Sequence, residues 1–405
     1  MKSVVAFVSL ALLGCAAIWA QNLGRKVGGR ESSAMTQQTT GAATTPVAPS
    51  QVSAAVEKGA RWLASVQGTD GGWGQDGGAT SHIRQTESLE SKGNDVANTA
   101  LAALALLRAG NQYRPQVERA VAFILQRVEA SPPDGLSVTD VKETQIQRKL
   151  GPYIDTFLAS MLLAQADPVL AKANKARARS GLEKCVAKIE RNQMSDGSWN
   201  VGGGWAPVLG TSLASRSLFE AGKNGVKVDR EVMARAESYT VKSQKDRGSV
   251  TYGGAGVGAG VGRGSATDAV SVSAVAGRGA PAALPAAAGV ELYQDAQALE
   301  QLSRTPEDRK KNAKEITAIH RKLSDAKFVA GYGSIGGEEF FSYLNISDGL
   351  KRSDGKEWAE WYAKTAQKIL KLQNSDGTWA GHHCITGRVA VTSAAILNLM
   401  PDRER

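Results

Sequence analysis

Three segments of the chain share the pattern Gln-x-x-Asp-Gly-x-Trp. They read QGTDGGW at 67–73, QMSDGSW at 193–199 and QNSDGTW at 373–379. A pattern with several fixed positions that recurs along a chain indicates an internal repeat, which restricts the fold more strongly than composition does. The repeated positions are Gln67, Asp70, Gly71 and Trp73; Gln193, Asp196, Gly197 and Trp199; and Gln373, Asp376, Gly377 and Trp379.

Each copy of the pattern lies between two predicted helices of different character. The helix before it is amphipathic, at 53–67, 178–193 and 357–373, as expected of a surface helix. The helix after it is apolar on nearly every face, as expected of a buried helix, at 98–110, 211–222 and 391–400. Gly suits the left-handed position that ends many helices, and Asp accepts bonds from turn amides. The pattern therefore predicts a turn that leads from an outer helix to an inner one.

Less regular copies of the same unit complete the series. Three more outer helices are predicted: one before Asp134-Gly135, one at 236–244 and one at 308–326. The inner helices that pair with them are predicted at 155–166, 287–302 and 339–350. Because the chain begins with an outer helix and ends with an inner one, we expect these two to pack together. The sequence therefore predicts an all-α fold, an α/α toroid in which six outer and six inner helices form a closed ring rather than an open solenoid.

The N-terminus indicates export. Residues 1–20 combine Lys2 with an apolar run and small residues, as in a signal peptide. We favour cleavage after Ala20; the alternative is lipid attachment at Cys15, because LLGC resembles a lipoprotein box. The composition of residues 21–50 predicts a disordered linker. Residues 51–405 are predicted to form the toroid, which a Gly/Ala-rich insert interrupts at 253–285. We expect a protein of the periplasm, the cell envelope or the extracellular space, without a transmembrane domain in the mature chain.

The formal net charge of +10 does not by itself indicate a nucleic-acid partner. The densest basic stretch, 304–327, is interrupted by acidic residues at helical spacing, which is typical of a solvated helix face. After simple export the remaining cysteines are Cys185 and Cys384, which predicts free thiols more readily than a disulfide framework.

The alternating helices and their Gln-x-x-Asp-Gly-x-Trp turns resemble the repeats of the terpenoid cyclase and protein prenyltransferase superfamily. This resemblance implies the toroid and a central cavity lined by inner helices. Squalene-type cyclases protonate their substrate with an acid in Asp-x-Asp-Asp or Asp-Cys-Thr-Ala-Glu, and neither motif occurs in this chain. The Asp-x-Cys zinc pair of the transferases is also missing, because Glu183 and Lys184 precede Cys185. The thioester motif of the related complement domains is absent as well.

The stretch GHHCITG, 381–387, partly resembles the histidine context of the zinc transferases. His382 and Cys384 are therefore the candidate metal ligands, for zinc, and we expect them on the same rim as Glu338 and Glu339. The candidate catalytic residues are Glu338, Glu339, His382 and His383. We favour the alternative, in which the histidines and Cys384 are structural, the glutamates complement a helix N-terminus, and the protein has no cofactor.

Four aromatic residues are candidates for lining a cavity: Trp205, Tyr332, Phe340 and Tyr343. With the motifs of both enzyme classes incomplete, we expect a non-catalytic binding or scaffold protein whose partner is an apolar small molecule, a lipid or an envelope protein. The alternative is an enzyme that acts on an isoprenoid or lipid substrate in the cavity.

Overall fold

The computed structural model describes residues 47–76, 93–200, 207–248, 287–331, 336–352, 356–382 and 385–401. The predicted signal peptide, most of the predicted linker and the insert lie outside them, as do Cys15, Trp205, Tyr332, His383 and Cys384. The regular elements of the described residues are helices, which confirms the predicted all-α class.

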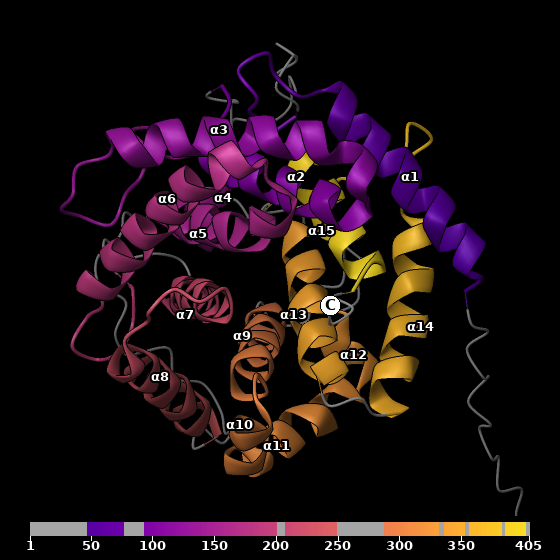
Figure 1. Cartoon of the computed structure of the whole chain (residues 1–405). Helices are drawn as coiled ribbons and strands as arrows, with labels where there is room; N and C mark the ends of the chain where they lie inside the picture. The colour runs from indigo at the N-terminus through magenta and orange to yellow at the C-terminus, as the bar shows by residue number, and fades with distance from the viewer. Residues whose placement is uncertain are drawn as a thin grey trace, which may run out of the picture. The chain divides into compact units, whose positions relative to one another are not determined.

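The inner wall of the toroid is a closed ring of helices. Each inner helix contacts the next one in chain order, and the last, α15, contacts the first, α2 (Figure 1). Because neighbours cover these helices on several sides, most of their faces are apolar, as the sequence predicts. The inner helices are α2 (Val96–Ala109), α5 (Ile154–Ala166), α7 (Pro207–Lys223), α9 (Ala287–Leu302), α13 (Gly337–Arg352) and α15 (Arg388–Leu399).

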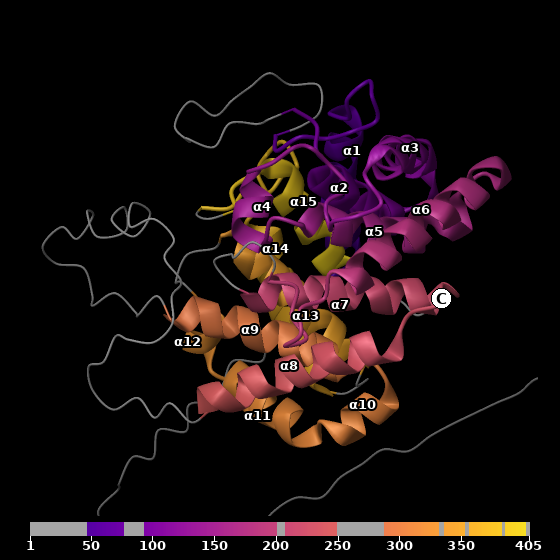
Figure 2. The same cartoon turned by 90° about the vertical axis from the view of Figure 1, so that its left-hand side faces the viewer.

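An outer layer of helices surrounds this ring. Most of these helices contact two neighbouring inner helices, and α1 contacts both α14 and α15, which confirms the predicted closure of the ring. In the view of Figure 2, the outer helix α8 lies beside α7 and α9. The outer helices are α1 (Pro49–Ser65), α3 (Arg114–Ala130), α6 (Lys172–Arg191), α8 (Arg230–Gly248), α10 (Pro306–Lys311), α11 (Ala313–Leu323) and α14 (Lys356–Lys371).

The outer helix predicted at 308–326 is divided into three. Helix α10 ends at Lys311 and α11 begins at Ala313; between them, the Asn312 side-chain amide donates to Glu237 of α8 over 3.0 Å. A short helix, α12 (Ala326–Val329), follows, and the Asp325 carboxylate before it accepts a hydrogen bond from the Lys327 amide. These polar contacts to the neighbouring helix and to the backbone break a stretch that is helical in its periodicity. The connections elsewhere contain η1 (Asn111–Tyr113), α4 (Gln145–Leu150) and η2 (Asp167–Val169).

In the three complete turns, the Trp joins the outer helix to the inner helix of the same repeat. The Trp73 indole donates to the Leu63 carbonyl at the end of α1 over 2.8 Å, and its backbone amide donates to the Thr99 hydroxyl of α2 over 2.9 Å. Trp199 makes the same pair of bonds with Ile189 and Thr211, and Trp379 makes them with Ile369 and Thr392.

The Gln of each turn joins one repeat to the next. Its amide group donates to a backbone carbonyl of the next outer helix: Gln67 to Gln116 over 3.0 Å, Gln193 to Val232 over 2.9 Å, and Gln373 to Ala55 over 2.8 Å. The turn glycines make the close approach feasible. Gly377 has a φ of 90°, and a Cβ there would lie 2.8 Å from the Lys58 Cβ of α1. The third turn therefore links the end of the chain to its beginning.

The bond that closes the ring can be tested with Gln373→Leu. This change removes the donors to the Ala55 and Gly377 carbonyls, and we expect a loss of about 1–2 kcal/mol in the free energy of unfolding. Because the lost bond holds α1, amide hydrogen exchange should accelerate in α1.

The matched control is Gln193→Leu, which removes the equivalent bonds to Gly197 and Val232. It should destabilise the protein by a similar amount and accelerate exchange in α8 instead of α1. Unchanged exchange in α1 of the Gln373→Leu variant would show that this bond does not close the ring.

Candidate functional site

An axial pocket lies at the centre of the ring and is lined by residues of all six inner helices. It is narrow, since it leaves about 50 Å³ for the centre of a water-sized sphere, which is room for a few water molecules. The resemblance implied a cavity in this place. The residues that line it are Leu101, Leu104, Arg108, Leu150, Ile154, Leu158, Met161, Gln165, Leu213, Arg216, Tyr293, Phe341, Leu344, Asn345, Asp348 and Leu397.

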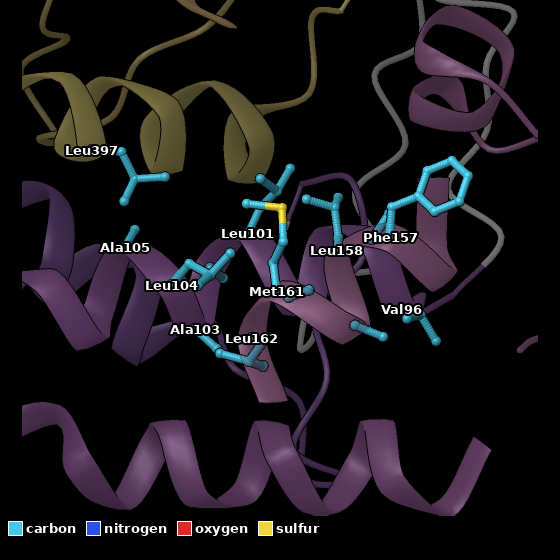
Figure 3. Close-up of a cluster of buried hydrophobic side chains, with 14 of the residues drawn as sticks. Val96, Leu101, Ala103, Leu104, Ala105, Phe157, Leu158, Met161, Leu162 and Leu397 are labelled. Atoms are coloured by element: carbon cyan, nitrogen blue, oxygen red, sulfur yellow. The ribbon is translucent and has the colours of Figure 1, made fainter. Parts of the chain in front are cut away.

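Most of the pocket surface is aliphatic. Figure 3 shows Leu101 and Leu104 of α2, Leu158 and Met161 of α5, and Leu397 of α15 pointing toward the same space. Such a lining favours an apolar group over a charged one. Unbranched Met161 can adjust its shape to that of a bound group.

One end of the axial pocket is polar, near the C-terminal ends of α2 and α5. Arg216 forms an ion pair with Asp348 and donates to the Asn345 side chain over 3.0 Å. Arg108 donates to the Met400 carbonyl over 3.0 Å. Burial alone lowers the pKa of Arg216, but the nearby Asp348 and Glu300 carboxylates reverse this effect and raise it. This end of the pocket therefore carries fixed charge of both signs.

A buried network of charges lies behind that end. Glu300 of α9 contacts Arg304 at 2.7 Å and Arg352 at 3.0 Å, and its side chain is fully buried. Burial alone raises the pKa of Glu300, but the surrounding arginines outweigh it and hold this pKa well below its ordinary value. Arg304 and Arg352 also lie 5.2 and 5.8 Å from the centre of the Phe219 ring. The network therefore stabilises the ionised form of Glu300.

Two buried carboxylates meet at the N-terminus of α2, at the other end of the inner helices. Asp95 accepts hydrogen bonds from the backbone and side-chain amides of Asn98, each over 2.8 Å. Asp155 of α5 accepts from the Ala97 amide over 3.1 Å and from the Gln147 side chain over 2.6 Å. Burial, together with the charge of Asp155, raises the pKa of Asp95 to about 7, and burial raises the pKa of Asp155 to about 6. Protons therefore bind to this pair near neutral pH.

The sequence contains a signal for Asp95 that a search for complete motifs misses. The residues from Asp95 read Asp-Val-Ala-Asn, which retains the first position of Asp-x-Asp-Asp and has Ala97 and Asn98 in the last two. An Asp directly before an apolar helix is also a typical N-cap. The contribution of Asp155 has no such signal, since it reaches α2 only through the packing of α5 against it.

The backbone around the two predicted rim glutamates contacts Ile385. Glu338 accepts a hydrogen bond from the Ile385 amide over 3.3 Å, and the Gly337 amide donates to the Ile385 carbonyl over 2.9 Å. Glu339 accepts from the Gly336 amide over 2.8 Å, and both glutamates are buried in the first turn of α13. His382 is exposed. Within the described ranges, His, Cys, Asp and Glu side chains form no group of three or more that could hold a metal ion.

The roles predicted for these residues in catalysis and zinc binding remain predictions, since His383 and Cys384 lie outside the described residues.

The two described aromatic candidates do not line the axial pocket. Phe340 is buried in the core, and its carbonyl accepts a hydrogen bond from Asn398 over 2.9 Å. Tyr343 instead lines a second pocket in the wall of the toroid, where its hydroxyl donates to the Val329 carbonyl over 3.1 Å. On the inner helices, Phe341 and Tyr293 provide the aromatic rings of the axial pocket.

Comparison with known proteins gives matches to one group of enzymes. The squalene-hopene cyclase C-terminal domain family matches residues 36–135. A squalene–hopene cyclase of Bradyrhizobium diazoefficiens is 40% identical over 70 residues, and a probable squalene–hopene cyclase of Sinorhizobium fredii is 36% identical over 69. Each match covers 17% of this chain and 10% of the relative, so the chain spans about a tenth of the length of these curated relatives.

Among solved structures, a type II terpene cyclase from Scytonema in complex with its product merosterolic acid A matches 87% of this chain and 96% of that one. The sequence identity is 11% and the TM-score 0.36.

The buried carboxylate pair predicts a specific dependence of stability on pH. The pKa values of both carboxyl groups are higher in the folded protein than the value of about 4 expected in the unfolded chain. The folded state therefore binds protons more tightly than the unfolded state does, and the free energy of unfolding decreases as pH rises from about 4 to about 7. Asp95→Asn removes one negative charge. The side-chain oxygen of Asn98 has no hydrogen-bond partner within the described residues, so the Asn98 amide can rotate and accept a hydrogen bond from the new side chain. The variant should gain about 1–2 kcal/mol over the parent at pH 8.

Thermal unfolding of both proteins between pH 4.5 and 8.5 measures this effect. The difference in Tm between Asp95→Asn and the parent should increase from pH 4.5 to about pH 7 and then level off. The control Asp134→Asn removes an exposed carboxylate and so lacks the burial that causes the effect. A difference for Asp95→Asn that does not change with pH would mean that the pair is not protonated in the folded state.

Proposed function

We propose that this chain is an exported toroid that binds an apolar ligand or a partner protein in or on the ring, with a small apolar group in the axial pocket, and that it does not cyclise this ligand. The squalene–hopene cyclase matches support the resemblance to the terpenoid cyclase superfamily, and the described helices form a toroid. Export is proposed from the sequence of residues 1–20 alone. None of the described helices combines the length and the apolar character needed to cross a membrane.

The observation that carries this proposal is the ion pair formed by the carboxylate that lines the axial pocket. Among the described residues that line the pocket, Asp348 is the only Asp or Glu, and it is paired with Arg216. The Arg216 guanidinium therefore engages this carboxylate. Protonation of an alkene requires a strongly acidic carboxyl group that is free to point its proton at the substrate. The apolar lining therefore supports binding, and the charge pair does not support cyclisation.

The alternative function is an enzyme that acts on an isoprenoid or lipid. The observation in its favour is the proton held near neutral pH by Asp95 and Asp155. A carboxyl group with a raised pKa is a weaker acid than usual, however, and both carboxylates accept hydrogen bonds from the first turn of α2. The pair is suited to proton exchange with a moderately basic group rather than to protonation of an alkene.

The binding proposal predicts that protein purified from its native envelope carries an apolar molecule, detectable by native mass spectrometry and by analysis of an organic extract. Leu213→Trp places a large side chain in the axial pocket and should abolish this association. Leu372→Trp is the matched control, because Leu372 is partly buried at the end of α14 and is not among the pocket residues; it should retain the molecule.

A parallel incubation with squalene, analysed by gas chromatography and mass spectrometry, tests the alternative. We expect squalene to be recovered unchanged. A cyclised product formed by the parent and lost in Leu213→Trp would overturn the binding proposal. Circular dichroism and Tm measurements of each variant establish that it is folded.

A further inference from the structure

A second pocket, the wall pocket, opens between the outer helices α11 and α14. Its volume is about 350 Å³, within the range of about 300–1,000 Å³ that is typical of sites for small molecules. In Figure 1 the short helix α12 lies between α11 and α14, and α12 and α13 complete the lining. The wall pocket is lined by His320, Leu323, Ser324, Ala326, Val329, Ala330, Tyr343, Leu350, Glu357, Glu360, Trp361, Lys364, Thr365 and Lys368.

The position of the wall pocket follows from the pattern of turns. A Gln side chain joins α1 to α3, α6 to α8 and α14 to α1. At the junction of α3 and α6, Lys188 donates instead to the Gly135 carbonyl over 2.8 Å and to the Ser137 carbonyl over 3.1 Å. The segment after α11 has no Gln-x-x-Asp-Gly-x-Trp pattern and folds into α12. The space between α11 and α14 is therefore left open.

The floor of the wall pocket is aromatic and held in place. Trp361 donates to the Ser347 hydroxyl over 2.9 Å, and the centre of its ring system lies 5.7 Å from that of the Tyr343 ring in an edge-to-face arrangement. Tyr343, Leu350 and Trp361 are all buried. Fixed aromatic rings beside a leucine provide a preformed surface for a planar or aliphatic group.

A cation lies against this floor. The Lys368 ammonium donates to the Tyr343 hydroxyl over 2.6 Å and lies 4.9 Å from the centre of the ring. This bond occupies one of its three protons. Burial lowers the pKa of Lys368, and the charge of Glu339 opposes this effect. A partly buried ammonium gains more from an anionic ligand than an exposed one does, because less water competes for it.

The remaining polar groups divide between the interior and the mouth of the wall pocket. Inside, His320 Nε2 is buried and has no hydrogen-bond partner within the part of the chain that the structure describes. Burial lowers the pKa of His320, and the charge of Glu357 opposes this effect. At the mouth, Glu357, Glu360 and Lys364 are exposed, and Glu360 lies 3.5 Å from Lys356. The interior therefore provides one cation and one unused imidazole nitrogen.

From this arrangement we infer that the wall pocket binds a small organic acid, with its apolar body against Tyr343 and Trp361 and its anionic group on the Lys368 ammonium. The His320 imidazole provides a second hydrogen bond to the polar end of the ligand. This site is separate from the axial pocket and does not depend on what the axial pocket binds.

Two fluorescent probes test the inference directly. 1-Anilinonaphthalene-8-sulfonate carries an aromatic body and an anionic group, and N-phenyl-1-naphthylamine has the same rings without the sulfonate. Lys368→Met should weaken binding of the sulfonate about tenfold and change binding of the neutral probe less than about twofold. Lys371→Met, on the same helix and outside the pocket, should leave the affinity for both probes unchanged.

A further pair of variants locates the probe. Ala330→Trp fills the wall pocket and should abolish binding of the sulfonate, whereas Leu213→Trp fills the axial pocket and should not affect it. Lys368→Gln serves as a second neutral variant if Lys368→Met unfolds, as judged by Tm. Equal affinities of the sulfonate for the parent and the neutral variant would overturn the inference, and so would loss of binding in Leu213→Trp with retention in Ala330→Trp.

Discussion

The structure depends on the hydrogen bond from the Gln side chain of each complete turn to a backbone carbonyl of the next outer helix. The acceptors are backbone carbonyls of Gln116, Val232 and Ala55, whose side chains differ in size and polarity. A bond to a carbonyl places no demand on residue type, so the outer helices can vary in sequence while the ring stays closed. Trp completes the turn by joining the outer helix to a Thr hydroxyl of the inner one.

The hydrogen bonds between neighbouring outer helices also influence where a pocket forms in the wall of the ring. A Gln or Lys side chain joins neighbouring outer helices at several junctions, whereas the wall pocket opens between α11 and α14. On the inner ring, a Cβ on Gly349 of α13 would lie 2.8 Å from the Leu299 side chain of α9. The lack of a side chain at Gly349 therefore allows these two inner helices to pack closely.

The fold could be predicted because its signals are local. The Gln, Asp, Gly and Trp of one turn lie close together in the sequence, and helix periodicity separates outer from inner elements. The sites could not be predicted in the same way. Asp155 influences Asp95 through tertiary packing alone. The sequence predicted that Tyr343 lines a cavity. Its helix, α13, is buried on nearly every side, so the sequence pattern cannot tell the axis of the ring from its wall. The break at Asn312 depends on Glu237 of another helix.

Ionisable groups of the inner helices lie at both ends of the ring. Asp95, Asp155, Glu338 and Glu339 lie at or near helix N-termini, where backbone amides are available to carboxylates, although burial outweighs this effect and raises the pKa of Asp95 and Asp155. Arg108, Lys223 and Arg352 lie in the last turns of their helices. Acidic side chains are therefore expected at the N-terminal ends of the inner helices whether or not the protein performs acid catalysis. An acidic residue on that rim is therefore weak support for an enzyme, and the pairing of Asp348 inside the axial pocket is the more informative observation.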